Sequence, residues 1–290
     1  MTVVDAFMSL PTADAVEHFD DQPLLADVAR FFGSGGPSRA MGVDDVVAAM
    51  TAAGIEQGVL TGSLIGGSWL TRGRSPADPT AEVIEGCERH PDRFRAAFMI
   101  DAIPRVDGIR TVCRRIEEVA SHPLVALVRV VPLLVEEPID SRVFYPVYER
   151  CEALSLPVSI NVGVPGPKVR ARYQDALLLD DVLIDFPHLV VIGAHMGHPW
   201  EDLLIRLMMK YENLYLSNSA YLAKYIDPRL VAFMNSSRGL GKVLFATDFP
   251  LLPFDRALNE ARRLALSADA MEAFLGESCK RVLRWDDRAA

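Results

Sequence analysis

The sequence has 290 residues, and half of them are hydrophobic, so the chain can bury a large core. A formal net charge of −9 and a pI near 5.2 argue against nucleic acid or an anionic membrane as the main partner, although a small anionic substrate remains compatible. No apolar run approaches the length of a membrane span. The cysteines are scattered without a C-x-x-C pair, which is typical of free thiols in a cytoplasmic protein.

Strand-like and helix-like segments alternate along the whole chain. The first half predicts strands at 2–7, 57–61, 94–100 and 124–131, followed by helices at 43–53, 81–89, 106–120 and 144–154. The second half predicts strands at 157–162, 189–195, 214–218 and 242–247, with helices at 175–186, 203–211, 228–234, 254–264 and 269–283. Eight strands, each followed by a helix, predict a single (β/α)₈ TIM barrel over residues 1–290. A doubly wound open sheet is the alternative, but no G-x-G-x-x-G follows an early strand.

The loops after the first two strands are the long ones. The first forms an insertion at about 10–43, in which Phe31 and Phe32 offer apolar surface for an interface between two copies of the chain, and the second contains Trp69. Long loops on the carboxyl face of a barrel commonly cover the active site, so Trp69 is either a wall for substrate or an ordinary loop anchor.

The chain is organised around the segment LVVIGAHMGHPW at 189–200. Its apolar run predicts a strand buried on both faces, and His195 stands where this strand ends. Ligands bind at that end of the strands in parallel α/β folds, so His195 is a candidate acid/base. The alternative is a histidine that hydrogen-bonds to backbone and closes the core.

Two further charged residues stand out. Asp248 follows the apolar strand that ends the barrel, where it could orient His195, act as a general acid or base, or bind a metal; helix N-capping is the alternative. Arg129 lies between two valines and needs a carboxylate from the protein or the substrate, whether it points into the barrel or towards the helices. The other strand ends supply further side chains to the same mouth: Phe7, Ser9, Thr61, Ser63, Asp101, Asn161 and Ser217.

Three runs in the sequence, HMGHPWED, KYENLYLSNSAYLAKY and VLFATDFPLLPFDRALNEA, resemble the amidohydrolase-related branch of the amidohydrolase superfamily. This branch includes aminocarboxymuconate-semialdehyde decarboxylase and resorcylate-type decarboxylases. The resemblance implies a (β/α)₈ barrel with one divalent metal at its mouth. The implied ligands are D-x-H-x-H on the first strand, a histidine on the fifth and an aspartate on the eighth. A histidine on the sixth strand is the implied acid/base, and the homodimer is the implied assembly.

The chain departs from this pattern at the metal ligands. The first strand reads Asp5-Ala6-Phe7-Met8-Ser9, and Asn161 stands on the fifth strand where the pattern has a histidine. Asp248 is the one ligand that matches, and His195 matches the catalytic histidine. Phenylalanine cannot coordinate a metal, and hydroxyl and amide oxygens are poor ligands for zinc. We therefore expect no tightly bound metal and no other cofactor.

The leading hypothesis is a metal-independent enzyme with His195 as the acid/base and Asp248 as its partner. It would decarboxylate a small carboxylated aromatic or unsaturated compound, or hydrolyse an activated ester or lactone. The expected substrate-binding residues are Ser9, Phe7, Trp69, Arg129, Asn161, His198 and Ser217. The alternatives are a metal-dependent enzyme with unrecognised ligands and an inactive barrel that serves as a binding protein. The expected partners are a small carboxylic acid and a second copy of the chain, but neither nucleic acid nor membrane.

Overall fold

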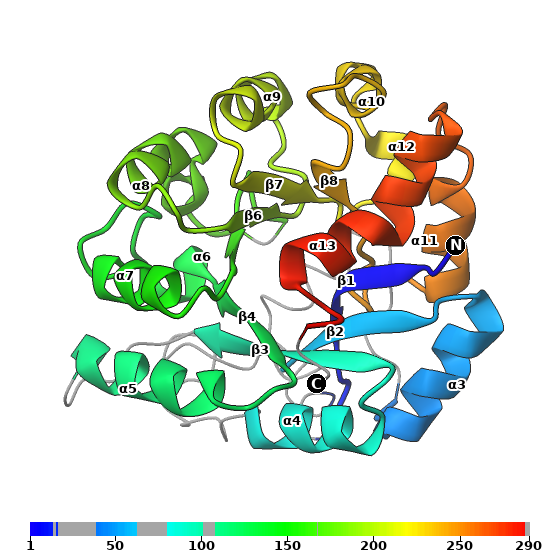
Figure 1. The fold of residues 1–290 in the computed structure, drawn as a ribbon, viewed down its shortest axis with the longest axis horizontal. Coiled ribbons are helices and arrows are strands. Elements are labelled where there is room, and N and C mark those ends of the chain that lie inside the picture. Colours follow the sequence, from blue (N-terminus) through cyan, green and yellow to red (C-terminus); the bar gives the residue numbers. More distant parts are fainter. Residues whose placement is uncertain (14–15, 17–38, 63–79, 101–107, 167, 288–290) are drawn as a thin grey trace.

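The computed structural model describes residues 1–13, 16, 39–62, 80–100, 108–166 and 168–287. The described residues form one sheet of eight parallel strands, each paired with the next in chain order (Figure 1). The strands are β1 (Val4–Ser9), β2 (Gln57–Thr61), β3 (Phe94–Ile100), β4 (Val125–Val130), β5 (Val158–Asn161), β6 (Val191–Ala194), β7 (Leu214–Ser217) and β8 (Val243–Leu244). The predicted (β/α)₈ barrel is therefore confirmed.

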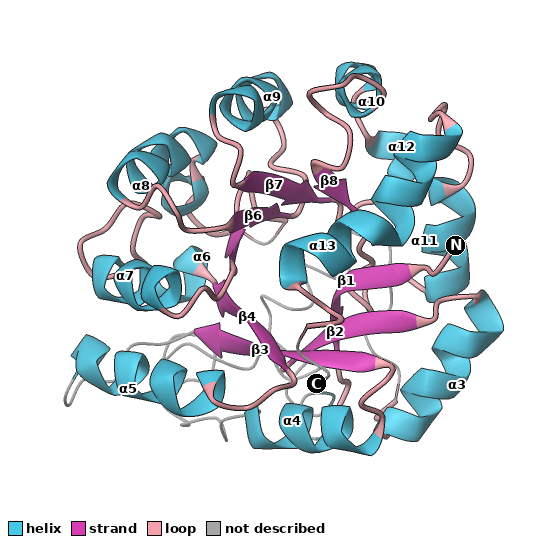
Figure 2. Ribbon diagram, viewed as in Figure 1, coloured by secondary structure: helices cyan, strands magenta, loops and turns pink. Residues whose placement is uncertain are grey.

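The helices surround the strands on the outside (Figure 2). The α-helices are α3 (Val43–Ala53), α4 (Thr80–Arg89), α5 (Gly108–Ala120), α6 (Pro132–Val135), α7 (Tyr145–Ala153), α8 (Leu179–Asp185), α9 (Glu201–Lys210), α10 (Pro228–Met234), α11 (Phe254–Ala261), α12 (Ala268–Glu272) and α13 (Ser278–Leu283). Four short turns of 3₁₀- or π-helix complete the set: η1 (Ala171–Gln174), η2 (Ala176–Leu178), η3 (Ala223–Tyr225) and η4 (Ala273–Glu277).

Each strand has two apolar faces because it is covered on both sides. The larger core fills the layer between sheet and helices and takes alternate strand residues such as Val158 and Ile160 of β5. The opposite faces of the strands fill the barrel interior, for example with Val59 of β2 and Ile192 of β6. This double burial explains the near-continuous hydrophobic runs in the sequence.

The barrel closes between β8 and β1 without a regular ladder. Backbone hydrogen bonds still join the two segments, from Ala6 N–H to Phe245 O and from Asp248 N–H to Phe7 O. The N–H groups of Ala246 and Thr247 donate to side-chain oxygens of Asn218 and Asp5. The predicted strand at 242–247 was therefore wrong beyond Leu244, because side chains replace the strand-to-strand hydrogen bonds there.

The C-terminal segment covers the amino end of the barrel, and Figure 1 shows α13 lying across it. Trp285 is 2% exposed, and the guanidinium carbon of Arg95 lies 4.5 Å from the centre of its ring. Arg95 sits near the start of β3 and donates Nη2–H to the carbonyl of Trp285. This closure leaves the carboxyl ends of the strands as the open end for a site.

Most predicted elements lie within a few residues of the observed ones, and those at 43–53, 57–61, 94–100 and 228–234 match in both bounds. The helix predicted at 175–186 is η2 followed by α8, and the one predicted at 269–283 is interrupted by the π-turn η4. The short helix α6 was not predicted. It begins at Pro132, whose ring suits the first turn of a helix as well as the end of a strand.

Three expectations lie outside the described residues: Trp69 as a substrate wall, Phe31 with Phe32 as an interface, and Ser63 with Asp101 at the mouth. Most of the insertion expected at about 10–43 is also outside them, so the single-domain organisation stays a prediction. Within the described part of the chain, no helix combines the length and apolar character required to cross a bilayer.

Candidate active site

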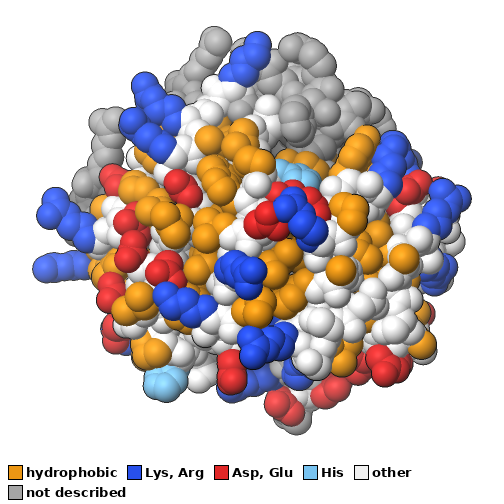
Figure 3. Space-filling view, turned by 90° about the horizontal axis from the view of Figure 1, so that it is seen from above, with side chains coloured by type: hydrophobic (Ala, Val, Ile, Leu, Met, Phe, Trp, Pro, Cys, Tyr) orange, Lys and Arg blue, Asp and Glu red, His pale blue; other side chains and the backbone are white. Residues whose placement is uncertain are grey.

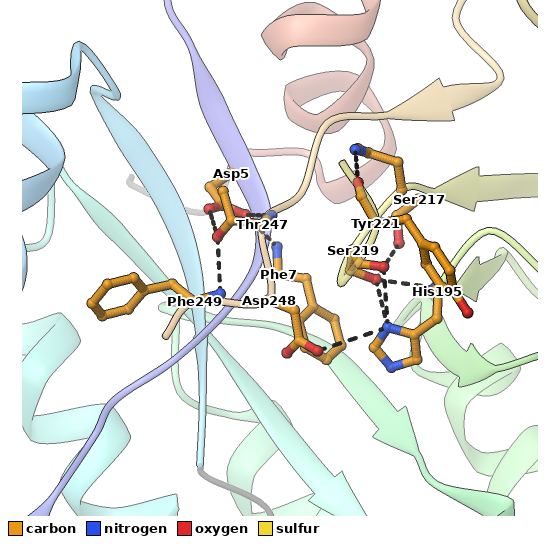
Figure 4. Close-up of polar contacts among 10 residues, drawn as sticks. Asp5, Phe7, His195, Ser217, Ser219, Tyr221, Thr247, Asp248 and Phe249 are labelled. Carbon is orange, nitrogen blue, oxygen red and sulfur yellow. Dashed lines mark hydrogen bonds and ion pairs between the residues drawn. The ribbon is translucent and has the colours of Figure 1, made fainter. Parts of the chain in front are cut away.

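The carboxyl ends of β6 and β8 bring the two predicted catalytic residues together. His195 directly follows β6, and Asp248 follows β8 by four residues. The Nδ1 atom of His195 lies 3.9 Å from Oδ2 of Asp248, and the two side chains are 17% and 10% exposed. Figure 4 shows the carboxylate and the imidazole facing each other.

Ser219, which the sequence analysis did not single out, holds His195 in place. Its Oγ accepts the backbone N–H of His195 at 3.0 Å and lies 3.0 Å from Nδ1 of the same residue. Ser217 Oγ lies 3.2 Å from Ser219 Oγ, so the serine chain continues to the end of β7. The signal in the sequence was a second hydroxyl two residues beyond Ser217.

This network accommodates either tautomer of the histidine ring. A serine hydroxyl has one donor and two acceptor lone pairs, and Ser219 Oγ uses one lone pair to accept the backbone N–H of His195. Its O–H donates to Nδ1 when the ring proton is on Nε2. When the ring proton is on Nδ1, this N–H donates to Ser219 Oγ or, at 3.4 Å, to the carbonyl of Ser219.

The backbone at both candidate catalytic residues is in the left-handed region. His195 has φ of 68° and Asp248 has φ of 59°, which only a few per cent of non-glycine residues adopt. Such strain costs about 1–3 kcal/mol per residue and persists where surrounding contacts impose it. Here the N–H of Asp248 donates to Phe7 O, and the N–H of Met196 donates to Ser217 O. The neighbouring strands therefore fix the loop conformations at the site.

Two glycines allow the loops after β5 and β6 to touch. A Cβ added at Gly163 would lie 2.9 Å from backbone atoms of Gly197, and both residues have positive φ. The contact is locked by a 2.7 Å hydrogen bond from Val164 N–H to His198 O. No larger residue fits at Gly163 without moving the segment that carries His195 and His198.

Burial sets the protonation of the pair. It lowers the pKa of His195 to about 3, and the positive charge of Arg129 acts in the same direction. Burial raises the pKa of Asp248 to about 6, and Arg129 opposes this rise. His195 is therefore neutral at pH 7, and Asp248 gains its proton only in mildly acidic solution.

Arg129 points into the barrel, which decides between the two directions that the sequence left open. Its guanidinium carbon lies 3.6 Å from the centre of the Phe7 ring, and the residue is 1% exposed. The Phe7 ring then meets the imidazole of His195 edge-on, with ring centres 5.2 Å apart. A cavity of about 10 Å³ beneath the mouth is lined by Arg129, Phe7, Thr61 and Ser159, among others.

The predicted polar residues Ser9, Asn161 and Ser217 are all buried at the ends of their strands. Asn161 lies on the same face of β5 as Ser159, which lines the interior cavity, so its side chain faces inward. Its Oδ1 atom is buried and has no hydrogen-bond partner among the described residues. A buried unpaired acceptor is costly, which makes it a candidate for binding a ligand.

His198 lies apart from His195, in a second hollow formed by the loops after β6, β7 and β8. Its Nδ1 pairs with the buried carboxylate of Glu201, and its ring meets Tyr221 with centres 4.7 Å apart. The cavity has a volume of about 350 Å³ and is lined by His198, Ala220, Tyr221, Leu222, Tyr225, Leu252 and Arg256. Its lining is mainly apolar, with an imidazole and a guanidinium at the wall.

Ion pairs fasten the outer side of these loops. Arg229 pairs with Asp202 at the start of α9 and, at 2.7 Å, with Asp227 at the start of α10. Figure 3 views the molecule from the side of α9 and α10 and shows side chains of both charges close together among hydrophobic ones. The loops that carry His198 and Tyr221 are thus anchored to two helix starts.

Asp5 is buried at the wall of the barrel and does not share the position of Asp248. Its carboxylate accepts the N–H groups of Phe7 and Thr247, each at 3.0 Å, and also the hydroxyl of Thr247 (Figure 4). Burial outweighs these hydrogen bonds and raises its pKa to about 7. Asp5 therefore fixes the segment before Asp248.

The side chains that the structure describes at the mouth do not suit a divalent cation. Within the described ranges, no three histidine, cysteine or acidic side chains gather in a group that could hold one. The hydrocarbon ring of Phe7 and the guanidinium of Arg129 occupy the floor beneath Asp248 and His195 instead. One carboxylate and one imidazole leave most of a coordination shell unfilled.

Comparison with known proteins adds a family and several similar folds. The amidohydrolase family model matches residues 42–285, whereas a search of curated proteins finds no match. An uncharacterised TIM-barrel protein from Bordetella bronchiseptica is 24% identical, covers 99% of this chain and 100% of its own, and has a TM-score of 0.80. A 5-carboxyvanillate decarboxylase from Novosphingobium aromaticivorans, complexed with manganese and a nitrobenzoic acid, is 15% identical. The match covers 98% of this chain and 96% of the decarboxylase, with a TM-score of 0.70. A 2,6-dihydroxybenzoate decarboxylase from Rhizobium is 16% identical over 99% of each chain, with a TM-score of 0.68. At these identities the likeness establishes the fold alone.

Proposed function

Because the chain belongs to the amidohydrolase family and is an enzyme of that superfamily, we propose that it is a metal-independent decarboxylase of a small carboxylated aromatic or unsaturated compound. The observation that carries this proposal is the pairing of His195 with Asp248 in one buried mouth, 3.9 Å apart. Two solved structures of similar fold are decarboxylases of aromatic acids, which supports the substrate class.

His195 is the proton donor in this proposal. It acts in the tautomer that carries the ring proton on Nε2, in which Nδ1 is an acceptor. Nε2–H gives this proton to the substrate carbon that bears the carboxylate, while Nδ1 takes the proton of Asp248. The bond from that carbon to the carboxylate then breaks, carbon dioxide leaves, and the bonding electrons return to the ring or double bond. To restore the starting state, Nδ1 returns its proton to the Asp248 carboxylate and Nε2 takes a proton from solvent.

Three groups would orient the substrate. The positive charge of Arg129 attracts the acid, and the unpaired Oδ1 of Asn161 accepts a hydroxyl hydrogen. The apolar cavity beside His198 receives the part of the substrate that does not react. Phe7, Ser9, Ser217 and Trp69 remain proposed neighbours of the substrate.

Hydrolysis of an activated ester or lactone is the second candidate. The 3.4 Å contact from Nδ1 to the carbonyl of Ser219 favours the opposite tautomer, in which Nε2 is a free base. His195, neutral because burial lowers its pKa to about 3, would then activate a water molecule. In this case Asp248 is needed as a carboxylate rather than as an acid.

A panel of hydroxylated and unsubstituted aromatic acids, enoic acids and lactones tests the proposal. Decarboxylation is measured by the release of carbon dioxide, and opening of a lactone is measured by the release of acid. Decarboxylation that disappears in His195→Ala supports the first candidate. Binding of these compounds without turnover of any of them would favour the remaining alternative, a binding protein.

The proposed assembly is a homodimer, by analogy with the family that the sequence resembles. Light scattering at micromolar concentration tests it, and a particle of 31.9 kDa alone would contradict it.

A further inference from the structure

Three side chains from different strands form a stack across the barrel. The guanidinium of Arg129 on β4 lies 3.6 Å from the centre of the Phe7 ring on β1, and this ring meets the imidazole of His195 after β6. Arg129 and Phe7 are 1% and 4% exposed. A charged group buried this deeply is held at one position by its surroundings, so its field at the mouth is fixed.

That field reaches both candidate catalytic groups. The charge of Arg129 lowers the pKa of both Asp248 and His195. For Asp248 it opposes the effect of burial, which raises the pKa, and for His195 it adds to the effect of burial, which lowers the pKa. Charges act more strongly in a water-poor interior than at the surface, because less solvent screens them. Any anion that enters the mouth is subject to the same attraction.

The same residues exclude the metal that one structure of similar fold contains. That decarboxylase is complexed with manganese, whereas this chain places a hydrocarbon ring at Phe7 and an amide at Asn161. A divalent cation beside Asp248 and His195 would also stand in the field of the guanidinium, which repels it. The donors and the charge therefore act against the cation together.

We propose that the guanidinium of Arg129, held against Phe7, supplies the fixed positive charge of this mouth in place of a metal ion. It attracts the anionic substrate and repels divalent cations. The part concerning substrate rests on the proposed function, whereas the part concerning cations does not. Arg129 is thus an electrostatic substitute for a metal ion.

The first test measures cation binding without turnover. The wild-type protein, dialysed and then titrated with Mn²⁺ in a calorimeter, should show no stoichiometric binding. A double variant, Phe7→His with Asn161→His, adds two ligands beside Asp248. Adding Arg129→Met to this double variant should strengthen Mn²⁺ binding at least roughly tenfold, because the repelling charge is gone. Stoichiometric Mn²⁺ in the wild-type protein, or equal affinities of the double and triple variants, would overturn the proposal.

The second test measures anion binding, with benzoate as the probe. Arg129→Met should weaken benzoate binding at least roughly tenfold, and Arg129→Lys should weaken it less because the charge is retained. The control is Arg150→Met, which removes a guanidinium paired with Glu117 on the outside of the barrel. Thermal melts establish that each variant is folded. If a variant fails to fold, the Mn²⁺ titration of the wild-type protein still tests the proposal. Unchanged benzoate affinity in folded Arg129→Met would contradict the proposal, whereas failure of decarboxylation alone would contradict only the proposed function.

Discussion

The imidazole of His195 and the carboxylate of Asp248 lie 3.9 Å apart at Nδ1 and Oδ2, although 53 residues separate them in the chain. Both residues have left-handed backbone conformations that the neighbouring strands impose. Strained, buried and mutually facing groups are typical of catalytic sites. The pairing therefore yields direct predictions about how the two residues act.

His195→Ala and Asp248→Ala should each lower turnover by roughly 10²–10⁴-fold, the usual range for acid/base catalysis. If the two side chains act as one unit, the double variant should be little worse than the poorer single variant. Steady-state kinetics of the three variants measure this coupling. Losses that multiply would mean independent roles, and wild-type turnover in His195→Ala would remove the histidine from the mechanism.

Ser219→Ala should lower the turnover number by roughly tenfold, since it removes a hydrogen bond that orients the His195 ring. The matched control is Ser121→Ala, because this hydroxyl donates to the carbonyl of Glu118 at the exposed end of α5, away from the mouth. The substrate KM should change little in either variant. Equal effects of the two substitutions would contradict an orienting role for Ser219.

The pH dependence separates the two candidate reactions. If Asp248 supplies the proton for decarboxylation, kcat/KM should fall by roughly tenfold per pH unit above about 6, the pKa to which burial raises this carboxyl. If Asp248 must be ionised for hydrolysis, kcat/KM should rise through the same region. His195, with its pKa lowered to about 3, adds no inflection near neutrality. A profile that is flat from pH 5 to 8 would exclude both assignments of Asp248.

Asp5→Asn should change how the stability of the protein depends on pH. Burial raises the pKa of Asp5 from 3.8 to about 7, so the folded state binds more protons than the unfolded state between these values. The stability that Asp5 contributes is complete below pH 4 and is lost as the pH rises to 7, at up to about 1.4 kcal/mol per pH unit. Urea denaturation at pH 4.5, 5.5 and 6.5 should show the wild-type protein losing stability relative to Asp5→Asn. A constant difference between them would mean that Asp5 does not titrate in this range.

Trp285→Ala should destabilise the protein by about 3–5 kcal/mol, because it empties a buried site and removes the ring beneath Arg95. The control is Asp287→Ala, an exposed neighbour whose effect should stay within about 0.5 kcal/mol. Chemical denaturation measures both. A loss below about 1 kcal/mol for Trp285→Ala would show that the C-terminal closure contributes little to the barrel.

Local pattern was sufficient for most of the secondary structure and failed at identifiable places. The helix at 43–53 was predictable because apolar residues repeat with the helical period and Gly54, in the left-handed conformation, ends it. The strand at 242–247 looked regular beyond Leu244, but Asn218 and Asp5 take its N–H groups. Those acceptors come from distant parts of the chain, so no local pattern reveals them.

For the site, the residue types and the end of the strand on which they lie were predictable, but their contacts were not. His195 and Asp248 follow buried strands, so a parallel barrel brings both to one mouth. The role of Ser219 was missed because its importance depends on the turn that returns its Oγ to the His195 ring. The direction of Arg129 could not be chosen, since alternation along a strand buried on both faces gives no polar side.

The sequence by itself therefore determined the family, through the resemblance of three runs to its members. It also determined the barrel and the two residues that face each other across its mouth, because these depend on hydrophobic periodicity and on side-chain chemistry at strand ends. Only the tertiary structure decided which groups lie within reach of one another: Ser219 against His195, Arg129 against Phe7, and Asn161, whose oxygen meets no hydrogen-bond donor in the described part of the chain. The physical reason is that pKa values, ring positions and fixed charges depend on distances of a few ångströms between strands. Those distances are set by barrel closure and by packing along the whole chain, which no single segment encodes.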